Sequence, residues 1–266
     1  MESGALDHHR GGSGEPLLLL HGIGHTWRGW KPMLALLERR FDVLAVDLPG
    51  FGHSPPLPPG TEPRPEALAD AVERAMDQAG FDRAHIAGNS LGGWIALELA
   101  RRGRALTVTA ISPAGLQHAR EKAWGRNMLL AMRWAARNLR APDSLLRTPL
   151  GAFLFAGPVV ARPWRLDPDE FAEVLRLFAD SPGFDATLPH TFDGQPRGLD
   201  AIDVPVLLVW GTLDLLLLPR QGRRFERLLP NAELRYVKRL GHTPMSDDPE
   251  LLAGAIGDFA ARNPGP

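Results

Sequence analysis

One pentapeptide, Gly88-Asn89-Ser90-Leu91-Gly92, constrains the fold more than any other part of the chain. A short apolar segment, residues 85–87, precedes it, and the helical pattern LGGWIALELARR follows over residues 91–102. A serine at the apex of a sharp strand-to-helix turn has positive φ, and flanking glycines relieve the crowding there. The segment therefore predicts a strand, a tight turn that exposes the Ser90 hydroxyl, and a helix. An ordinary serine in a glycine-rich turn is the alternative, because so short a pattern also arises by chance.

Short apolar runs alternate with helical patterns along most of the chain. This alternation is typical of an α/β fold, with a mostly parallel central sheet and helices on both faces. Six runs are predicted to be buried strands: Leu17–Leu20, Val43–Val46, Ile86–Ala87, Thr107–Ile111, Val206–Trp210 and Leu234–Val237. Further helices are predicted over Pro32–Arg40, over Glu66–Ala79 with Gly80 as its stop, and over Leu251–Ala261.

Residues 115–198 interrupt the alternation. They contain helical patterns over Lys122–Leu139 and Pro168–Ala179 but no convincing strand, and they are too many for one crossover. We therefore predict an inserted, mainly helical cap over residues 115–198 and a core formed by residues 1–114 and 199–266. A longer set of crossover helices is the alternative.

Composition narrows the function further. With 266 residues, 44% of them hydrophobic, the chain is long enough for one large α/β domain. A net charge of −1 gives no reason to expect nucleic acid as a partner, and the lack of cysteine excludes thiol catalysis. The first 16 residues lack the long apolar core of a signal peptide or membrane span, so we expect a cytoplasmic protein without integral membrane association. His8–Leu17 is interpreted as a flexible leader.

A nucleophilic serine needs a base, and the base needs an orienting acid. His242 is the only histidine after the predicted cap, and it lies in a loop just past the last predicted strand. Asp214 directly follows the strand Val206–Trp210, at the sheet edge where open parallel sheets bind ligands. Asp247 and Asp248 lie too close in sequence to His242 to be preferred as the acid.

Two backbone N–H groups are candidates for an oxyanion hole. Leu91 begins the helix after Ser90, where N–H groups point at developing negative charge. Ile23 lies in the loop His21-Gly22-Ile23-Gly24 after the first strand, whose glycines allow close approach to a substrate carbonyl. A plain glycine turn is the alternative for this loop, and His21 is predicted to be structural.

Four motifs, in this order, resemble those of the α/β-hydrolase superfamily: His21–Gly24, Asp47–Ser54, Gly88–Gly92, and the pair Gly211–Asp214 with Gly241–His242. The resemblance covers nearly the whole chain outside the cap. It implies an α/β-hydrolase fold, a Ser90–Asp214–His242 triad with the N–H groups of Ile23 and Leu91 as oxyanion hole, and no metal or cofactor. Two features depart from the family: a shortened N-terminal hairpin, and the run Leu215–Leu218 after Asp214.

The resemblance implies a serine hydrolase of the carboxylesterase type, acting as monomer or homodimer on a small to medium hydrophobic ester. Four side chains are candidates for substrate binding: Trp124, Trp164, Leu215 and Leu216. Ordinary packing between the cap and the sheet explains them equally well.

Two other functions stay open. The pentapeptide and the segment Ser112–Leu116 also resemble carbon–carbon hydrolases of aromatic ring-fission products. For that reaction Arg162 or Arg165 of the predicted cap is a candidate to hold a substrate carboxylate, although a solvated arginine is the more common explanation. Thr243 stands where those relatives often carry an aromatic residue, which weakens this alternative. A non-catalytic, ligand-binding member of the fold is the third possibility.

Overall fold

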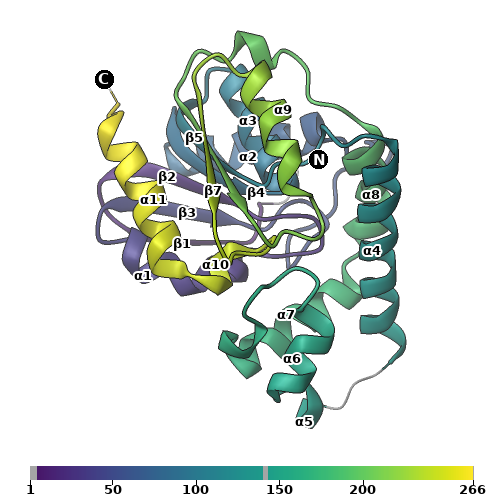
Figure 1. Ribbon diagram of the computed structural model, residues 1–266. Helices are drawn as coiled ribbons and strands as arrows, with labels where there is room; N and C mark the ends of the chain where they lie inside the picture. The colour runs from purple at the N-terminus through teal and green to yellow at the C-terminus, as the bar shows by residue number, and fades with distance from the viewer. Residues whose placement is uncertain (1–4, 140–142, 266) are drawn as a thin grey trace.

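The computed structural model describes residues 5–139 and 143–265. Residues 1–4 and 266 of the predicted core, and residues 140–142 of the predicted cap, lie outside the described residues. A seven-stranded sheet in the order β1-β3-β2-β4-β5-β6-β7 forms the centre, and only its β1–β3 pair is antiparallel among the described strands (Figure 1). The strands are β1 (His8–Gly12), β2 (Glu15–Leu20), β3 (Phe41–Val46), β4 (Ala84–Asn89), β5 (Ala105–Ile111), β6 (Val206–Gly211) and β7 (Ala232–Val237).

Helices cover both faces of the sheet. Those of the core are α1 (Lys31–Leu37), α2 (Pro65–Ala79), α3 (Leu91–Arg101), α9 (Gly222–Leu228), α10 (Pro244–Asp247) and α11 (Pro249–Arg262). One apolar cluster joins α1, α10 and α11 to one face, and a second joins α2, α3 and α9 to the other. The predicted stop of α2 is confirmed, because Gly80 follows it in the left-handed conformation with φ 78°.

The second strand shows why the core strands have continuous apolar runs. Successive side chains of a strand point to opposite faces, so a strand covered on both sides needs apolar residues at every position. Leu17 and Leu19 pack in the cluster of α1 and α11, whereas Leu18 and Leu20 pack in the cluster of α2 and α3. All four side chains are fully buried.

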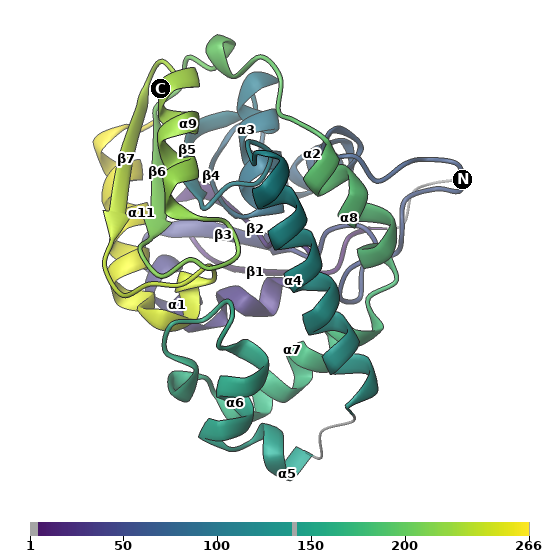
Figure 2. The same ribbon diagram turned by 45° about the vertical axis from the view of Figure 1, so that its right-hand side comes forward.

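The described residues between β5 and β6 form helices and contain no strand, as predicted for an inserted cap. The cap helices are α4 (Ala119–Asn138), α5 (Asp143–Leu146), α6 (Pro149–Ala156), α7 (Pro168–Asp180) and α8 (Gly183–Asp193). Figures 1 and 2 show α5, α6 and α7 as a group set beside the sheet and reached along the length of α4. At the start of α4 the buried carboxylate of Glu121 binds Arg220 and Arg224 of the core. The cap is thus attached to the core by charge as well as by apolar packing.

Two predictions about the sheet are wrong. His8–Gly12, interpreted as part of a flexible leader, forms β1, which pairs antiparallel with β3 at one edge. Backbone pairing rather than apolar burial makes this strand, since its side chains alternate between exposed and half-exposed. The strand predicted over Leu234–Val237 is not buried: β7 is the other edge strand, and its Tyr236 is 40% exposed.

No helix among the described residues is both long enough and apolar enough to cross a membrane.

Candidate active site

Ser90 occupies the predicted turn between β4 and α3, with φ 57° and ψ −115°. Its N–H donates to the carbonyl of Ile111 at 2.9 Å, which fixes this costly conformation from the neighbouring strand. A Cβ on Gly88 would lie 2.2 Å from the carbonyl oxygen of Gly92, and one on Gly92 would lie 2.3 Å from that of Leu20. The predicted steric reason for both glycines is therefore confirmed.

Asp214 and His242 are hydrogen-bonded to each other. Nδ1 of His242 lies 2.8 Å from Oδ2 of Asp214, and both side chains are almost completely buried. Oδ1 of Asp214 accepts the N–H groups of Leu216 at 3.0 Å and Leu217 at 2.8 Å. The carboxylate has only acceptors, so Nδ1 of His242 carries the shared hydrogen and Nε2 is left as the basic nitrogen.

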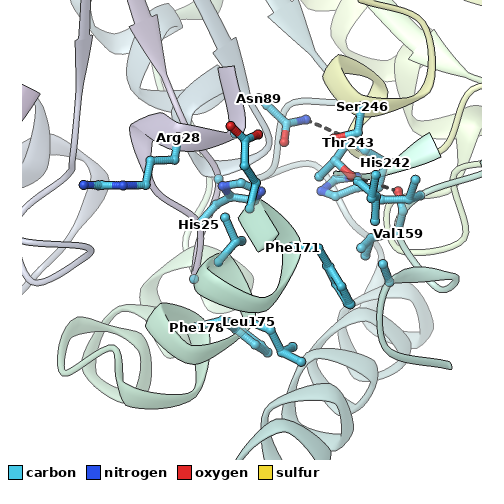
Figure 3. A pocket seen from close by; sticks show the side chains of 18 of the residues that line it. His25, Arg28, Asn89, Val159, Phe171, Leu175, Phe178, His242, Thr243 and Ser246 are labelled. Atoms are coloured by element: carbon cyan, nitrogen blue, oxygen red, sulfur yellow. Dashed lines mark hydrogen bonds between the residues drawn. The ribbon is translucent and has the colours of Figure 1, made fainter. Parts of the chain in front are cut away.

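Asn89 connects the serine turn to the histidine loop. Its side-chain Nδ2 donates to the carbonyl of His242 at 2.9 Å and to that of Ile111 at 3.2 Å. Figure 3 shows Asn89, His242 and Thr243 together at one side of a cavity, and Ser90 lines the same cavity. Sequence reasoning missed this role because Asn89 stands at a position of the pentapeptide where any residue is allowed.

The loop that holds Ile23 lies directly against Ser90. A Cβ on Gly22 would be 3.1 Å from Cβ of Ser90, and Ile23 itself lines the cavity. Leu91 is the first residue of α3, so its N–H has no carbonyl within the helix to donate to. His21 supports the loop from behind: its ring accepts the N–H of Leu48 at 2.9 Å and donates to the carbonyl of Gly22 at 2.8 Å. Burial lowers the pKa of His21 to about 4, so this ring is neutral.

The cavity has a volume of about 590 Å³ and lies between the core and the cap. Ser90 and His242 lie on its core side. The opposite side comes mainly from the cap and is largely apolar, with Phe171, Leu175 and Phe178 of α7 visible in Figure 3, although Arg165, Asp167 and Glu170 also line it. An apolar wall facing a few polar groups is the usual form of a small-molecule site.

The four predicted substrate-binding residues lie in different places. Leu216 is buried and lines the cavity. Trp124, Trp164 and Leu215 are more than half exposed and are not among the described side chains that line it, in contrast to the prediction. Trp124 instead donates its indole N–H to the carbonyl of Leu215 at 2.7 Å, which ties α4 to this loop from outside. Leu216 and Leu217, whose N–H groups bond to Asp214, are both buried in the core, whereas Leu215 before them is exposed.

The two cap arginines also differ. Arg165 lines the cavity, and its Nη1 donates to the carbonyl of Asp247 at 3.0 Å. Arg162 donates to the same carbonyl at 3.2 Å but is not among the described residues that line the cavity.

His25 is a cavity residue that sequence reasoning did not select. Burial first, and then the neighbouring His21, lower the pKa of His25 to about 4. Gly29 makes room for the ring, since a Cβ there would lie 2.2 Å from the imidazole. The one sequence feature that could have pointed to His25 is its position directly after the loop His21–Gly24. Within the described residues, no group of three or more His, Asp or Glu side chains is arranged to hold a metal ion.

Known proteins resemble this chain over most of its length. Residues 17–255 match the alpha/beta hydrolase family. The pimeloyl-(acyl-carrier protein) methyl ester esterase of Neisseria meningitidis is 32% identical over 91% of this chain and 91% of its own. Epoxide hydrolase EphH of Mycobacterium tuberculosis is 32% identical over 72% of this chain and 92% of its own.

A solved structure gives the same result for the fold. The crystal structure of a membrane phospholipase A, described as a bacterial virulence factor, aligns with a TM-score of 0.78 at 27% identity. The alignment covers 99% of this chain and 86% of that one. The chain belongs to the alpha/beta hydrolase family.

Proposed function

We propose that this protein is a serine carboxylesterase that cleaves a small to medium hydrophobic ester through an acyl-enzyme on Ser90. The observation that carries the proposal is the hydrogen-bonded pair of His242 and Asp214, which shares a cavity with a serine on a strained turn. Nucleophile, base and acid in this relation are the requirements of serine hydrolysis.

The chemistry follows from these positions. Ser90 attacks the ester carbonyl while its proton passes to Nε2 of His242, and Asp214 stabilises the imidazolium that forms. The N–H groups of Ile23 and Leu91 stabilise the negative charge on the carbonyl oxygen. His242 then protonates the departing alcohol, and water repeats the cycle to release the acid.

The substrate class rests on the cavity and on one relative. A wall of Phe171, Leu175 and Phe178 favours an apolar acyl or aryl group. The relative from Neisseria meningitidis is named as a methyl ester esterase. The relative EphH is named as an epoxide hydrolase, but a serine at the elbow favours acyl transfer over epoxide opening by an aspartate.

The test is hydrolysis of p-nitrophenyl esters of graded acyl length by the wild type and by Ser90→Ala. We expect the variant to lose at least about 10³-fold in kcat. Ser13→Ala, an exposed serine between β1 and β2, is the control and keeps the wild-type rate. A p-nitrophenyl phosphonate should label Ser90 alone, as read by peptide mass spectrometry. Full activity of Ser90→Ala refutes the assignment, and turnover of dienoic ring-fission acids without ester hydrolysis favours carbon–carbon cleavage.

A further inference from the structure

Asp247 has a buried carboxylate that no step of ester hydrolysis uses. Its side chain is fully buried at the end of α10, five residues after His242. Oδ2 accepts the N–H of Gly241 at 2.7 Å and that of Ala161 at 3.2 Å, and Oδ1 accepts the N–H of Arg162 at 2.7 Å. A carboxylate that accepts several backbone N–H groups forms strong, charge-assisted bonds. This one joins the residue before His242 to a segment of the cap.

The same two segments are joined a second time. The carbonyl of Val159 in the cap accepts the N–H of His242 at 2.8 Å and that of Thr243 at 3.0 Å. Gly241 has no space for a side chain, because a Cβ there would lie 2.7 Å from the carbonyl oxygen of Val159. The cap backbone over residues 159–162 is therefore packed directly on the backbone that carries the base.

The backbone of His242 is consequently supported on both sides. Its carbonyl is held from the core by Asn89, and its N–H is held from the cap by Val159. Asp247 accepts the backbone N–H of Gly241, the residue before His242. It also accepts N–H groups of the cap segment that contains Val159. A displacement of about 1 Å at a catalytic group is enough to lower a rate by about 10².

Building on the proposed function, we propose that Asp247 is a positioning residue for His242, and that it makes the cap segment 159–162 part of the support of the base. The cap therefore contributes to the rate of proton transfer as well as to substrate binding. Glu121 also attaches the cap to the core, but it does so through Arg220 and Arg224. Asp247 differs from it because its carboxylate bonds to the residue next to His242.

The test compares Asp247→Asn with Asp248→Asn. The amide at 247 keeps the size of the side chain but turns an NH2 toward at least one of the three N–H donors. Asp248 is the matched control, because it contacts Arg162 of the same cap segment at 3.5 Å and caps α11. Among the described residues, no hydrogen bond or ion pair joins its side chain to residues 241–243. We expect Asp247→Asn to lower kcat about 10- to 100-fold with less than threefold change in KM. Asp248→Asn keeps kcat within twofold. If Asp247→Asn does not fold, Asp247→Glu moves the carboxylate by one methylene, and the same fall in kcat is expected.

Two further measurements separate positioning from a structural effect. In a His242→Ala background, Asp247→Asn should lower the residual rate no further, because its effect passes through the imidazole. Hydrogen exchange of Asp247→Asn should be faster at the amides of Gly241, His242 and Thr243, and at those of Ala161 and Arg162. This exchange does not depend on the substrate, so it tests the proposal even if Ser90→Ala shows that the ester chemistry is wrong. An undiminished effect in the His242→Ala background, or exchange and kcat equal to those of Asp248→Asn, overturns the proposal.

Discussion

Replacing Asp214 by asparagine should convert His242 from a base into a ring with the wrong nitrogen protonated. Oδ1 of Asp214 accepts the N–H groups of Leu216 and Leu217, so the amide oxygen of an asparagine takes this position. The NH2 group then faces Nδ1 of His242, where the carboxylate oxygen Oδ2 lies 2.8 Å away in the wild type. Nδ1 becomes an acceptor and the hydrogen moves to Nε2, which is the nitrogen that must receive the serine proton.

The size of the expected decrease in kcat follows from two free-energy costs. Restoring the active tautomer makes two buried donors face each other, which costs about 1–3 kcal/mol. The charge-assisted bond that stabilises the imidazolium is also lost, at about 1.5–3 kcal/mol. Together these losses predict a decrease in kcat of about 10² to 10⁴, since each 1.36 kcal/mol corresponds to about a factor of ten.

The assay is kcat and KM for one p-nitrophenyl ester over a pH series. We expect kcat to fall and KM to stay within about threefold, because Asp214 does not face the substrate. Asp203→Asn is the control, since Asp203 is an exposed acid just before β6, at the opposite end of the strand that Asp214 follows. A kcat for Asp214→Asn within tenfold of the wild type would refute the reasoning.

Three other predictions concern the turn, the cap and the cavity. Gly88→Ala should destabilise the fold by about 3 kcal/mol or more, read as a fall in Tm, because its Cβ would lie 2.2 Å from the carbonyl oxygen of Gly92. Burial raises the pKa of Glu121, but its hydrogen bonds to arginines outweigh this and lower the pKa to about 2. The ionised form therefore stabilises the folded state fully above about pH 4.5 and loses this effect toward pH 2. Glu121→Gln should lower Tm at pH 7, and its deficit relative to the wild type should shrink steadily between pH 5 and pH 3; a constant deficit would contradict this. Leu216→Ala should raise KM for medium-chain esters about tenfold because it removes apolar contact from the cavity wall, and Trp164→Ala should not, because Trp164 does not line the cavity; equal effects would contradict the assignment.

Local steric rules explain which features could be predicted from the sequence. The turn at Ser90 needs its glycines, and the place of Asp214 after a buried strand sets it at the correct edge of the sheet. Both depend on residues that are close in sequence, so the pattern is sufficient. The edge strand His8–Gly12 is different, because pairing with β3 stabilises it and its side chains carry no apolar signal.

The cavity wall was predicted less well for a related reason. Trp124 and Trp164 are the kind of residue that lines a hydrophobic pocket. Whether they face the cavity or the solvent depends on how their helices are oriented, which the local sequence does not show. Trp124 bonds to a carbonyl 91 positions away in the chain. A local sequence pattern carries no information on such long-range contacts. The contacts of Asp247 with the cap could not be predicted for the same reason.

The two-sided burial of β2 has a consequence for unfolding. Leu17 and Leu19 belong to one apolar cluster and Leu18 and Leu20 to the other, so one strand is shared by both. If the helices of either face separate from the sheet, leucines of β2 become exposed to water. The two halves of the core should therefore unfold as a single cooperative unit. The outer part of the cap has an apolar cluster of its own, which includes Leu146, Ala156 and Phe171. Val160 belongs both to this cluster and to the segment held by Asp247, so an early opening of the outer cap should loosen the support of His242 before the sheet that carries Ser90 is disturbed.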